Sequence, residues 1–566
     1  MPKIEIDKKA FYEQLKEKPS NDKLEQDLVC AKAELDDDMV EDGILKIELN
    51  DTNRPDLWST AGLVRQMKLY KGMEIPTYGF FSDSNTRKTG EKEVQVDAGL
   101  KDIRPYIAAF AVSGKPLDSA MLNDIIQTQE KLCWNYGNKR ESVAMGVYRS
   151  DLFTYPVQYK AADPDKTKFV PLNMENELSL REILTKHPKG EEFGYIVSEL
   201  PKFPYITDAN GDTLSFPPII NSAKIGAVEE GDTNLFIELT GTDIYSLLHT
   251  ANIVACDFAD FGYTVQPVKI SYPYDTPLGR EIITPYYFQK PVTVELDYVN
   301  RMLGTDFSLA AAQERLCKMG CKAKIEGTKL TVTPPEYRND FMHPVDIVED
   351  IMIGHGMDNF EPIMPTDFTV GRVSPVEKFS RELKDIMIGM GYQEMIYNYL
   401  GSGKDYIEKM NITGEDIIQI ANPMTENYQY VRNSALPGLL SSESISGHAV
   451  YPHKIFEIGK AVFRSPQNNY GADTYTLLSF LTADREADFN QISSQISAVF
   501  YYMALIYELE EAEDPRFIPG RAARVLFNKN PIGIFGEIHP QVLENWGIDM
   551  PCIAGEIMLE PIIKNR

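Results

Sequence analysis

The chain has 566 residues, 43% of them hydrophobic, which is enough for about three to five globular domains, each with its own core. Its formal charge of −27 argues against a general nucleic-acid coat protein, whose affinity comes from an excess of Lys and Arg, but local contacts to a folded RNA remain possible. No apolar run reaches the length of a membrane span, and the six cysteines are scattered. We therefore expect a soluble cytoplasmic protein with reduced thiols.

The first segment, residues 1–90, is predicted to be a mixed α/β domain. Residues 43–50 alternate as a strand does, and the polar turn at residues 51–57 leads into a helix that carries Trp58, Leu63 and Met67. Asn53, Arg54 and Asp56 are compatible with a ligand site, but Asn, Pro and Asp all favour turns, so a turn is the preferred interpretation. A polar stretch between about residues 80 and 100 predicts the first domain boundary.

The second domain is predicted over residues 100–270, where strands alternate with helices. Residues 107–112 and 143–148 have the pattern of buried strands. Two further apolar runs, residues 216–222 and 234–243, each end in small polar groups, as strands do at the mouth of a pocket. The candidate pocket residues are Asn221, Ser222, Glu238, Thr240, Thr242 and Asp243. The alternative, that these residues end strands and cap the next helix, is about as well supported for each residue singly.

The third domain, residues 275–365, is predicted to be a compact helix-and-strand module similar to winged-helix proteins, and it contains an acidic cluster. With Pro344 in the first turn of a helix, Asp346, Glu349 and Asp350 share one helical face, and Asp340 lies just upstream. Such acids repel one another unless a cation, a basic partner or solvent relieves them, and an all-oxygen set suits Mg²⁺. Spacing alone favours a simpler interpretation, in which the acids complement the helix dipole.

The last domain, residues 368–566, begins with a predicted capping box, Ser374 to Glu377, and a helix with one apolar face. Four sequence motifs follow it at well-separated positions: Asn422-Pro423, residues 430–440 with Leu-Pro-Gly-Leu-Leu, Phe456-Glu-Ile-Gly459, and Gly536-Glu-Ile-His-Pro540.

These motifs, together with Asn53-Arg-Pro-Asp-Leu57, Tyr337-Arg-Asn-Asp340 and Asp346-Ile-Val-Glu-Asp-Ile351, resemble in order those of the phenylalanyl-tRNA synthetase β-subunit family. The resemblance covers nearly the whole chain. The chain resembles the shorter archaeal and eukaryotic kind, since it has no room for the oligonucleotide-binding insert and the anticodon-binding domain usual in bacterial forms. Met357 stands where the family more often has Tyr.

The resemblance implies a multidomain α+β fold. Its parts are mixed α/β N-terminal and editing domains, the winged-helix-like module, and a C-terminal antiparallel sheet with helices that is related to class II synthetases but does not catalyse synthesis. It also implies an α2β2 tetramer with an α subunit, binding of tRNA(Phe), and ligation of phenylalanine with ATP and Mg²⁺. By the same resemblance, Asp340, Asp346, Glu349 and Asp350 bind Mg²⁺ near the α subunit, and residues 100–270 hydrolyse tRNA mischarged with tyrosine.

A physical argument supports an editing pocket in such an enzyme. An apolar site for phenylalanine rejects an analogue with one extra hydroxyl only about 10²-fold, whereas a second site that hydrogen-bonds the hydroxyl can reject phenylalanine by roughly 10⁴ to 10⁵. No Ser-His-Asp set or zinc motif is present in this region, so we expect hydrolysis by a positioned water, helped by a hydroxyl of the tRNA.

Class II active sites bind ATP through one arginine in a Phe-Arg-x-Glu motif and another in a later Gly-x-Gly-x-x-Arg motif. Both arginines are missing here, because no arginine stands between Phe456 and Glu457, and Glu537 follows the glycines of residues 533–536. Arg521 and Arg524 are expected at a surface or interface. Two alternatives remain open. One is a structural partner subunit whose editing pocket is inactive, and the other is a stand-alone metal-dependent phosphotransferase that uses the acidic cluster.

Overall fold

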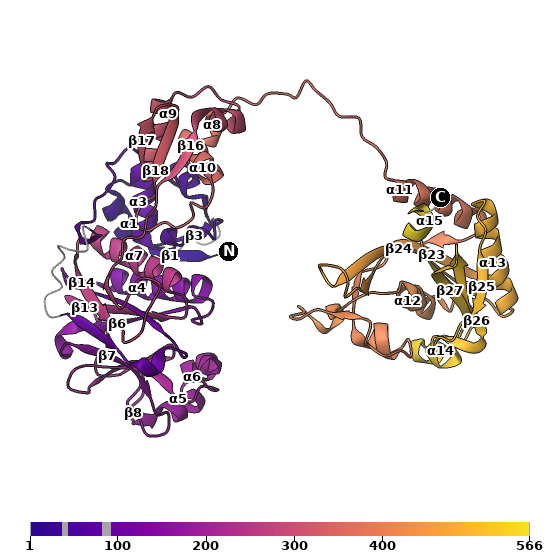
Figure 1. Ribbon diagram of the computed structural model, residues 1–566, viewed down its shortest axis with the longest axis horizontal. Helices are drawn as coiled ribbons and strands as arrows, with labels where there is room; N and C mark the ends of the chain where they lie inside the picture. The colour runs from indigo at the N-terminus through magenta and orange to yellow at the C-terminus, as the bar shows by residue number, and fades with distance from the viewer. Residues whose placement is uncertain (1, 37–42, 82–91, 565–566) are drawn as a thin grey trace. The chain divides into compact units, whose positions relative to one another are not determined.

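The computed structural model describes residues 2–36, 43–81 and 92–564 (Figure 1). The chain forms two compact units, Met1–Ile363 and Met364–Arg566. Within the polar stretch that predicts the first boundary, residues 82–91 lie outside the described residues. The second predicted boundary, near residue 275, falls inside the first unit and stays a prediction. No helix in the described part of the chain is long and apolar enough to cross a membrane.

The N-terminal part of the first unit is a small antiparallel sheet with helices packed on it. Its strands, in the order β1-β3-β2, are β1 (Lys3–Asp7), β3 (Ile44–Leu49) and β2 (Ala33–Leu35). The strand predicted from alternation at residues 43–50 is confirmed. A single turn of 3₁₀ helix, Pro55–Leu57, leads into α3 (Thr60–Tyr70), and the accompanying helices are α1 (Lys8–Leu15) and α2 (Asn21–Leu28).

A ten-stranded mixed sheet forms the centre of the first unit. Its order is β12-β11-β10-β7-β4-β14-β5-β13-β6, with β15 paired to β14. The strands are β4 (Glu93–Val96), β5 (Tyr106–Ser113), β6 (Val143–Arg149), β7 (Val157–Ala162), β10 (Phe203–Thr207), β11 (Thr213–Phe216), β12 (Ile220–Asn221), β13 (Asn234–Gly241), β14 (Thr264–Ser271) and β15 (Glu281–Thr284). The predicted buried strands at residues 107–112 and 143–148 are confirmed as parts of β5 and β6.

The apolar run at residues 216–222 is not one strand. β11 ends at Phe216, a cis bond joins Pro217 to Pro218, and β12 then pairs back against β11. Proline has no N–H to donate to a sheet, so two prolines in succession end the strand and the run folds into a hairpin.

Helices cover the central sheet. α7 (Ile244–Asp260) packs on β5, β13 and β14, and it is buried along most of its length because it is largely apolar. α4 (Ser119–Lys131) continues into one π-helical turn, Leu132–Tyr136. Near β10 and β11 lie the short elements β8 (Lys168–Phe169), β9 (Leu178–Ser179), α5 (Leu180–Lys186) and α6 (Pro188–Phe193), which share a separate apolar cluster with those strands.

The predicted third module has its own core in the structure. A three-stranded sheet, β16 (Val292–Glu295), β18 (Lys329–Thr333) and β17 (Lys322–Glu326), packs with α8 (Leu296–Leu303), α9 (Leu309–Lys318) and α10 (Pro344–His355) around residues such as Val299, Leu316 and Ile351. Pro344 occupies the first turn of α10, as the sequence predicts.

The second unit is a seven-stranded sheet with helices, antiparallel except where β19 meets β23. Its order is β19 (Gln393–Glu394), β23 (His453–Arg464), β24 (Ala472–Ala483), β28 (Cys552–Met558), β27 (Asn530–Ile538), β26 (Phe517–Phe527) and β25 (Glu508–Glu511). The helices are α11 (Pro375–Gly389), α12 (Leu436–Ser446), α13 (Phe489–Tyr502), α14 (Pro540–Trp546) and α15 (Glu560–Lys564), and β20 (Leu400–Gly401), β22 (Tyr430–Val431) and β21 (Ile418–Gln419) form a minor sheet.

The capping box predicted at α11 is only half formed. Ser374 Oγ accepts a hydrogen bond from the N–H of Glu377, as expected. The Glu377 carboxylate, however, accepts from Arg381 one turn later instead of turning back to the start of the helix.

Candidate functional site

Two of the predicted pocket residues, Glu238 and Thr240, lie on the same face of β13, because side chains alternate along a strand. Glu238 stands opposite Ala109 of β5 and Gly146 of β6. Its Oε1 accepts a hydrogen bond of 2.7 Å from the Tyr148 hydroxyl, which also lies 2.8 Å from Ser215 Oγ. A methyl group at Gly146 would overlap the Tyr148 hydroxyl, so glycine is what allows this contact.

The Glu238 carboxyl is buried and has one unused oxygen. Burial raises its pKa to about 7, although Tyr148 and Arg104 both act to lower it. Its Oε2 has no hydrogen-bond partner among the described residues. A buried polar atom without a partner is costly, so Oε2 needs a hydrogen-bonding group that the described residues do not supply, such as a water or a ligand hydroxyl.

A buried arginine holds the neighbouring Thr240. Arg104 Nε lies 3.0 Å from Thr240 Oγ1, and Nη2 lies 2.6 Å from the carbonyl oxygen of the same residue. Arg104 also donates to the carbonyl oxygens of Arg140 and Glu141, on the loop that precedes β6. One guanidinium therefore fixes both the end of β13 and this loop.

In the part of the chain that the structure describes, no hydrogen bond joins the other four predicted residues to Glu238. Asn221 is half-buried, with Nδ2 3.4 Å from the Val147 carbonyl oxygen, and Ser222 Oγ donates to the Thr213 carbonyl oxygen. Thr242 is exposed, and Asp243 accepts from the N–H of Ser246 as the N-cap of α7. For Asp243 the capping alternative is the one that the structure shows.

The structure adds three residues that the sequence did not single out: Arg104, Tyr148 and Ser215. They come from three distant segments, so no spacing links them. The available signal was that Tyr148 is a polar residue at the end of a predicted buried strand, beside the strand that carries Glu238.

The acids of the predicted magnesium site have partners within the chain. Arg338 donates to Asp340, with Nη2 2.6 Å from Oδ2, and to Asp350, with Nη1 2.7 Å from Oδ2. Arg338 and Asp350 are buried, and Asp340 is largely buried. Burial works against ionisation of Asp340, but the Arg338 guanidinium outweighs it and lowers the pKa to about 2.

Asp346 and Glu349 point to different partners. Asp346 Oδ2 accepts from the N–H groups of Met342 and His343 at the start of α10. Glu349 Oε1 pairs with Lys32 from the N-terminal part of the unit at 2.5 Å.

This arrangement does not fit a magnesium ligand set. In residues 2–36, 43–81 and 92–564, no group of three or more His, Cys, Asp or Glu side chains is disposed to hold a metal ion. A basic partner, left open by the sequence, relieves the repulsion between Asp340 and Asp350. The magnesium assignment therefore rests on the resemblance alone.

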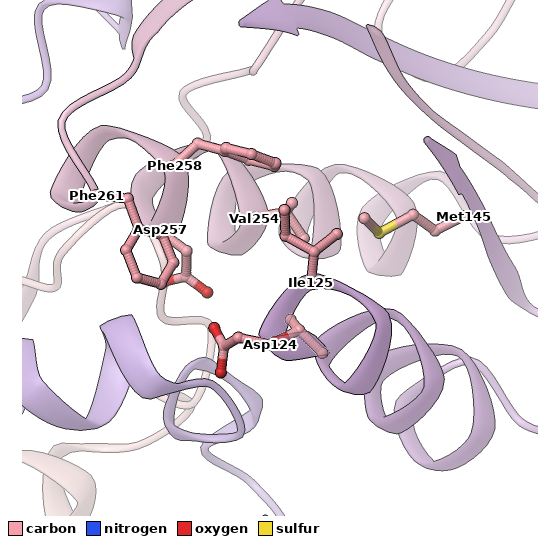
Figure 2. A pocket seen from close by; sticks show the side chains of 8 residues that line it. Asp124, Ile125, Met145, Val254, Asp257, Phe258 and Phe261 are labelled. Atoms are coloured by element: carbon pink, nitrogen blue, oxygen red, sulfur yellow. The ribbon is translucent and has the colours of Figure 1, made fainter. Parts of the chain in front are cut away.

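A second pair of buried carboxyls lies beside a small cavity. Asp124 of α4 and Asp257 of α7 point toward one another in Figure 2, and the cavity is otherwise lined mainly by apolar side chains. Burial raises the pKa of Asp124 to about 6 and that of Asp257 to about 7. Thr60 donates to Asp124 and Ser59 donates to Asp257, so the pair anchors the start of α3.

In the second unit, Glu457 has an arginine partner from another part of the chain. Arg432 forms a two-pronged ion pair with it, at 2.8 and 3.0 Å, and both side chains are buried. Arg521 and Arg524 are substantially exposed and pair with Glu537 and Glu510, in line with the predicted surface role.

Comparison with known proteins places these features in a family. Residues 292–357 match the family model of the tRNA synthetase B5 domain, and residues 361–559 match that of the phenylalanyl-tRNA synthetase β chain CLM domain. The chain is 46% identical over 565 residues to the phenylalanine–tRNA ligase β subunit of Borrelia recurrentis and 45% identical over 569 residues to that of Borreliella burgdorferi (strain ZS7), with all of both chains covered in each case.

A solved structure agrees. An N-terminal fragment of the phenylalanyl-tRNA synthetase β subunit from Pyrococcus horikoshii is 36% identical, with a TM-score of 0.59, and the match covers 63% of this chain and all of the fragment. Identity over the full length, two family models and this fold all agree, and the chain belongs to the phenylalanine–tRNA ligase β-subunit family, a component of an aminoacyl-tRNA ligase.

Proposed function

We propose that this chain assembles with an α subunit as an α2β2 tetramer, binds tRNA(Phe), and hydrolyses tyrosyl-tRNA(Phe), while the α subunit joins phenylalanine to the tRNA with ATP and Mg²⁺. The class II arginine is missing from the chain's Phe456-Glu457 motif, which supports leaving synthesis to the partner. The six cysteines are free thiols, as expected if the enzyme works in the cytoplasm.

One observation carries the editing proposal: the buried Oε2 of Glu238 without a partner. Oε1 of the same carboxyl already accepts a hydrogen bond from a phenolic hydroxyl, that of Tyr148. A tyrosyl group presents the same hydroxyl, whereas a phenylalanyl group presents none and leaves Oε2 unpaired. Selection for tyrosine follows from that difference.

Side chains around the Glu238 carboxyl hold its neighbours in place. Arg104 fixes Thr240 and the loop that contains Arg140, and Ser215 holds Tyr148. With these groups fixed, a positioned water can attack the ester of tyrosyl-tRNA(Phe), and the chain needs no covalent nucleophile.

The test is deacylation of tyrosyl-tRNA(Phe) and phenylalanyl-tRNA(Phe) by the purified tetramer. We expect Glu238→Ala/Thr240→Ala to lose at least about tenfold in tyrosyl-tRNA(Phe) hydrolysis, because the buried carboxyl proposed to hydrogen-bond the substrate hydroxyl is gone. Glu230→Ala is the control, since Glu230 is an exposed residue shortly before the same strand.

Equal rates for the double variant and the unsubstituted enzyme would show that this cluster does not edit. The chain would then be a structural partner subunit with an inactive pocket. Phenylalanine ligation by all three enzymes should be equal, which separates loss of editing from loss of assembly.

A further inference from the structure

Trp134 is a tryptophan on the surface of the first unit. The chain has three tryptophans, and Trp58 and Trp546 are buried, whereas 46% of Trp134 is exposed. The Trp134 and Phe193 rings pack in a T-shaped pair, with the ring centroids 6.1 Å apart. The indole is therefore held in place while part of it stays open to solvent.

The backbone that carries Trp134 is unusual on both sides. Trp134 lies in the π-helical turn that ends α4, and such turns occur often at functional sites. Three consecutive non-glycine residues then have positive φ: Asn138 at 48°, Lys139 at 52° and Arg140 at 71°. Side chains rarely adopt this conformation, and runs of it persist only where surrounding contacts enforce it.

Those contacts lead directly to the proposed editing residues. Arg104, which holds Thr240, donates to the carbonyl oxygens of Arg140 and Glu141. The Arg140 side chain donates to the carbonyl oxygens of Pro218 and Ile219, just before β12. The strained loop is thus fastened to both strands of the site, and Trp134 and Lys139 are presented beside it.

One cation, Lys139, lies next to the indole. Lys139 Nζ lies 5.6 Å from the centroid of the Trp134 ring, and within the described parts of the chain Lys139 forms no ion pair. Residues 131–140 contain Lys131, Lys139 and Arg140 and no acid, although Glu130 and Glu141 flank them, in a chain of net charge −27. A local cation beside an exposed aromatic face suits a base stacked on the ring and a phosphate near the amine.

We propose that Trp134 and Lys139 form a docking surface for the single-stranded 3′ end of the tRNA, with a base stacked on the indole. The proposal rests on the proposed editing function and extends it, since it says where the strand that carries the ester enters. A surface for a protein partner would equally expose an aromatic ring, but it would not call for a lysine without an ion pair on the loop that Arg104 joins to Thr240.

The test uses the full chain and its own tryptophan fluorescence, because Trp134 is the tryptophan that a bound base can reach. Intact tRNA(Phe) should quench the emission, and tRNA(Phe) from which the single-stranded 3′ nucleotides have been removed should not. In the tetramer, Trp134→Ala should raise the KM for tyrosyl-tRNA(Phe) hydrolysis on the order of tenfold with little change in kcat, and Trp134→Tyr should restore it.

Lys139→Ala should weaken binding and lower the dependence of affinity on salt by about one ion. Tyr470→Ala is the control, since Tyr470 is an 89% exposed aromatic residue in the second unit.

Quenching by both RNAs or by neither would overturn the proposal, as would weakened assembly with the α subunit in Trp134→Ala at unchanged KM. If tyrosyl-tRNA(Phe) is hydrolysed normally but Trp134 is not quenched, this inference alone fails. If no hydrolysis occurs in the unsubstituted enzyme, the proposed function itself fails.

Discussion

Two carboxyl groups of this chain show how surroundings decide charge at a single residue. Glu238 is buried and Asp340 is largely buried, yet the pKa of Glu238 is raised to about 7 and that of Asp340 is lowered to about 2. Burial acts in the same direction on both, because it disfavours the charged form. The difference is the bidentate Arg338 beside Asp340, whereas the donor beside Glu238 is a neutral phenol.

This difference predicts how stability depends on pH. The folded Glu238 carboxyl keeps its proton up to about pH 7, and the unfolded one releases it near its ordinary value of 4.5. The contribution of Glu238 to the free energy of unfolding is therefore complete below pH 4.5 and is lost as the pH rises through 7. The free energy of unfolding falls by about 3 kcal/mol over this range. Urea unfolding at several pH values should show this slope in the unsubstituted chain and a shallower one in Glu238→Gln. Identical slopes would contradict the assignment.

At the scale of elements, side-chain contacts fasten helices to one another. The start of α3 is held by Ser59 and Thr60, which donate to acids of α7 and α4. Arg65, further along α3, pairs with Asp257 and Asp260 of α7. The N-terminal part of the first unit is thereby joined to the helices that cover the central sheet.

We expect Asp124→Ala to destabilise the first unit by about 1–3 kcal/mol, because the Thr60 hydroxyl and N–H lose a buried acceptor. Glu130→Ala is the control, since Glu130 is an exposed residue near the end of the same helix, α4. Thermal or urea unfolding of the three chains measures the effect. Equal stability of all three would mean that the contact with Asp124 does not anchor α3.

Local patterns in the sequence predicted elements well, and contacts between distant segments poorly. The alternation at residues 43–50 and Pro344 at a helix start each gave the observed element, because strand period and proline geometry are local properties. The partnership of Arg104 with Thr240 joins residues 136 positions apart, and no pattern along the chain encodes it. The acids near α10 were found from the sequence. The position of Arg338 between Asp340 and Asp350 was not, because it depends on how residues 338–340 fold back on α10.

The acidic cluster can be used to test whether Arg338 or a magnesium ion relieves the repulsion between its carboxylates. We expect a chelator to leave the unfolding temperature of the chain unchanged, because Arg338 already forms ion pairs with both Asp340 and Asp350. Arg338→Met should cost about 3–5 kcal/mol, since it leaves two buried carboxylates without a cation. Arg280→Met, which removes an exposed ion pair with Asp275, should have little effect. A clear loss of stability on chelation would restore the magnesium site.

At the scale of the whole molecule, the chain is divided into two compact units whose cores are separate. The large apolar cluster of the first unit and those of the second are built from separate sets of residues. Residues 361–373 contain no helix or strand, and all of them are exposed, including the apolar side chains of Ile363, Met364 and Phe368. Such a segment has few contacts to protect its backbone from a protease.

Limited digestion should therefore cut the chain first between its two units. Trypsin cleaves after basic residues, and Arg372 is the one arginine or lysine in residues 361–373. We expect early fragments that end and begin at this position, and we expect Arg372→Gln to lose them while cleavage elsewhere is unchanged. Fragments can be assigned by mass.

Adding the α subunit gives a second measurement: if the exposed apolar side chains of this segment are buried on assembly, cleavage at Arg372 slows in the tetramer. If the free chain is cut first inside either unit, the division at residues 361–373 is not the weakest point of the molecule.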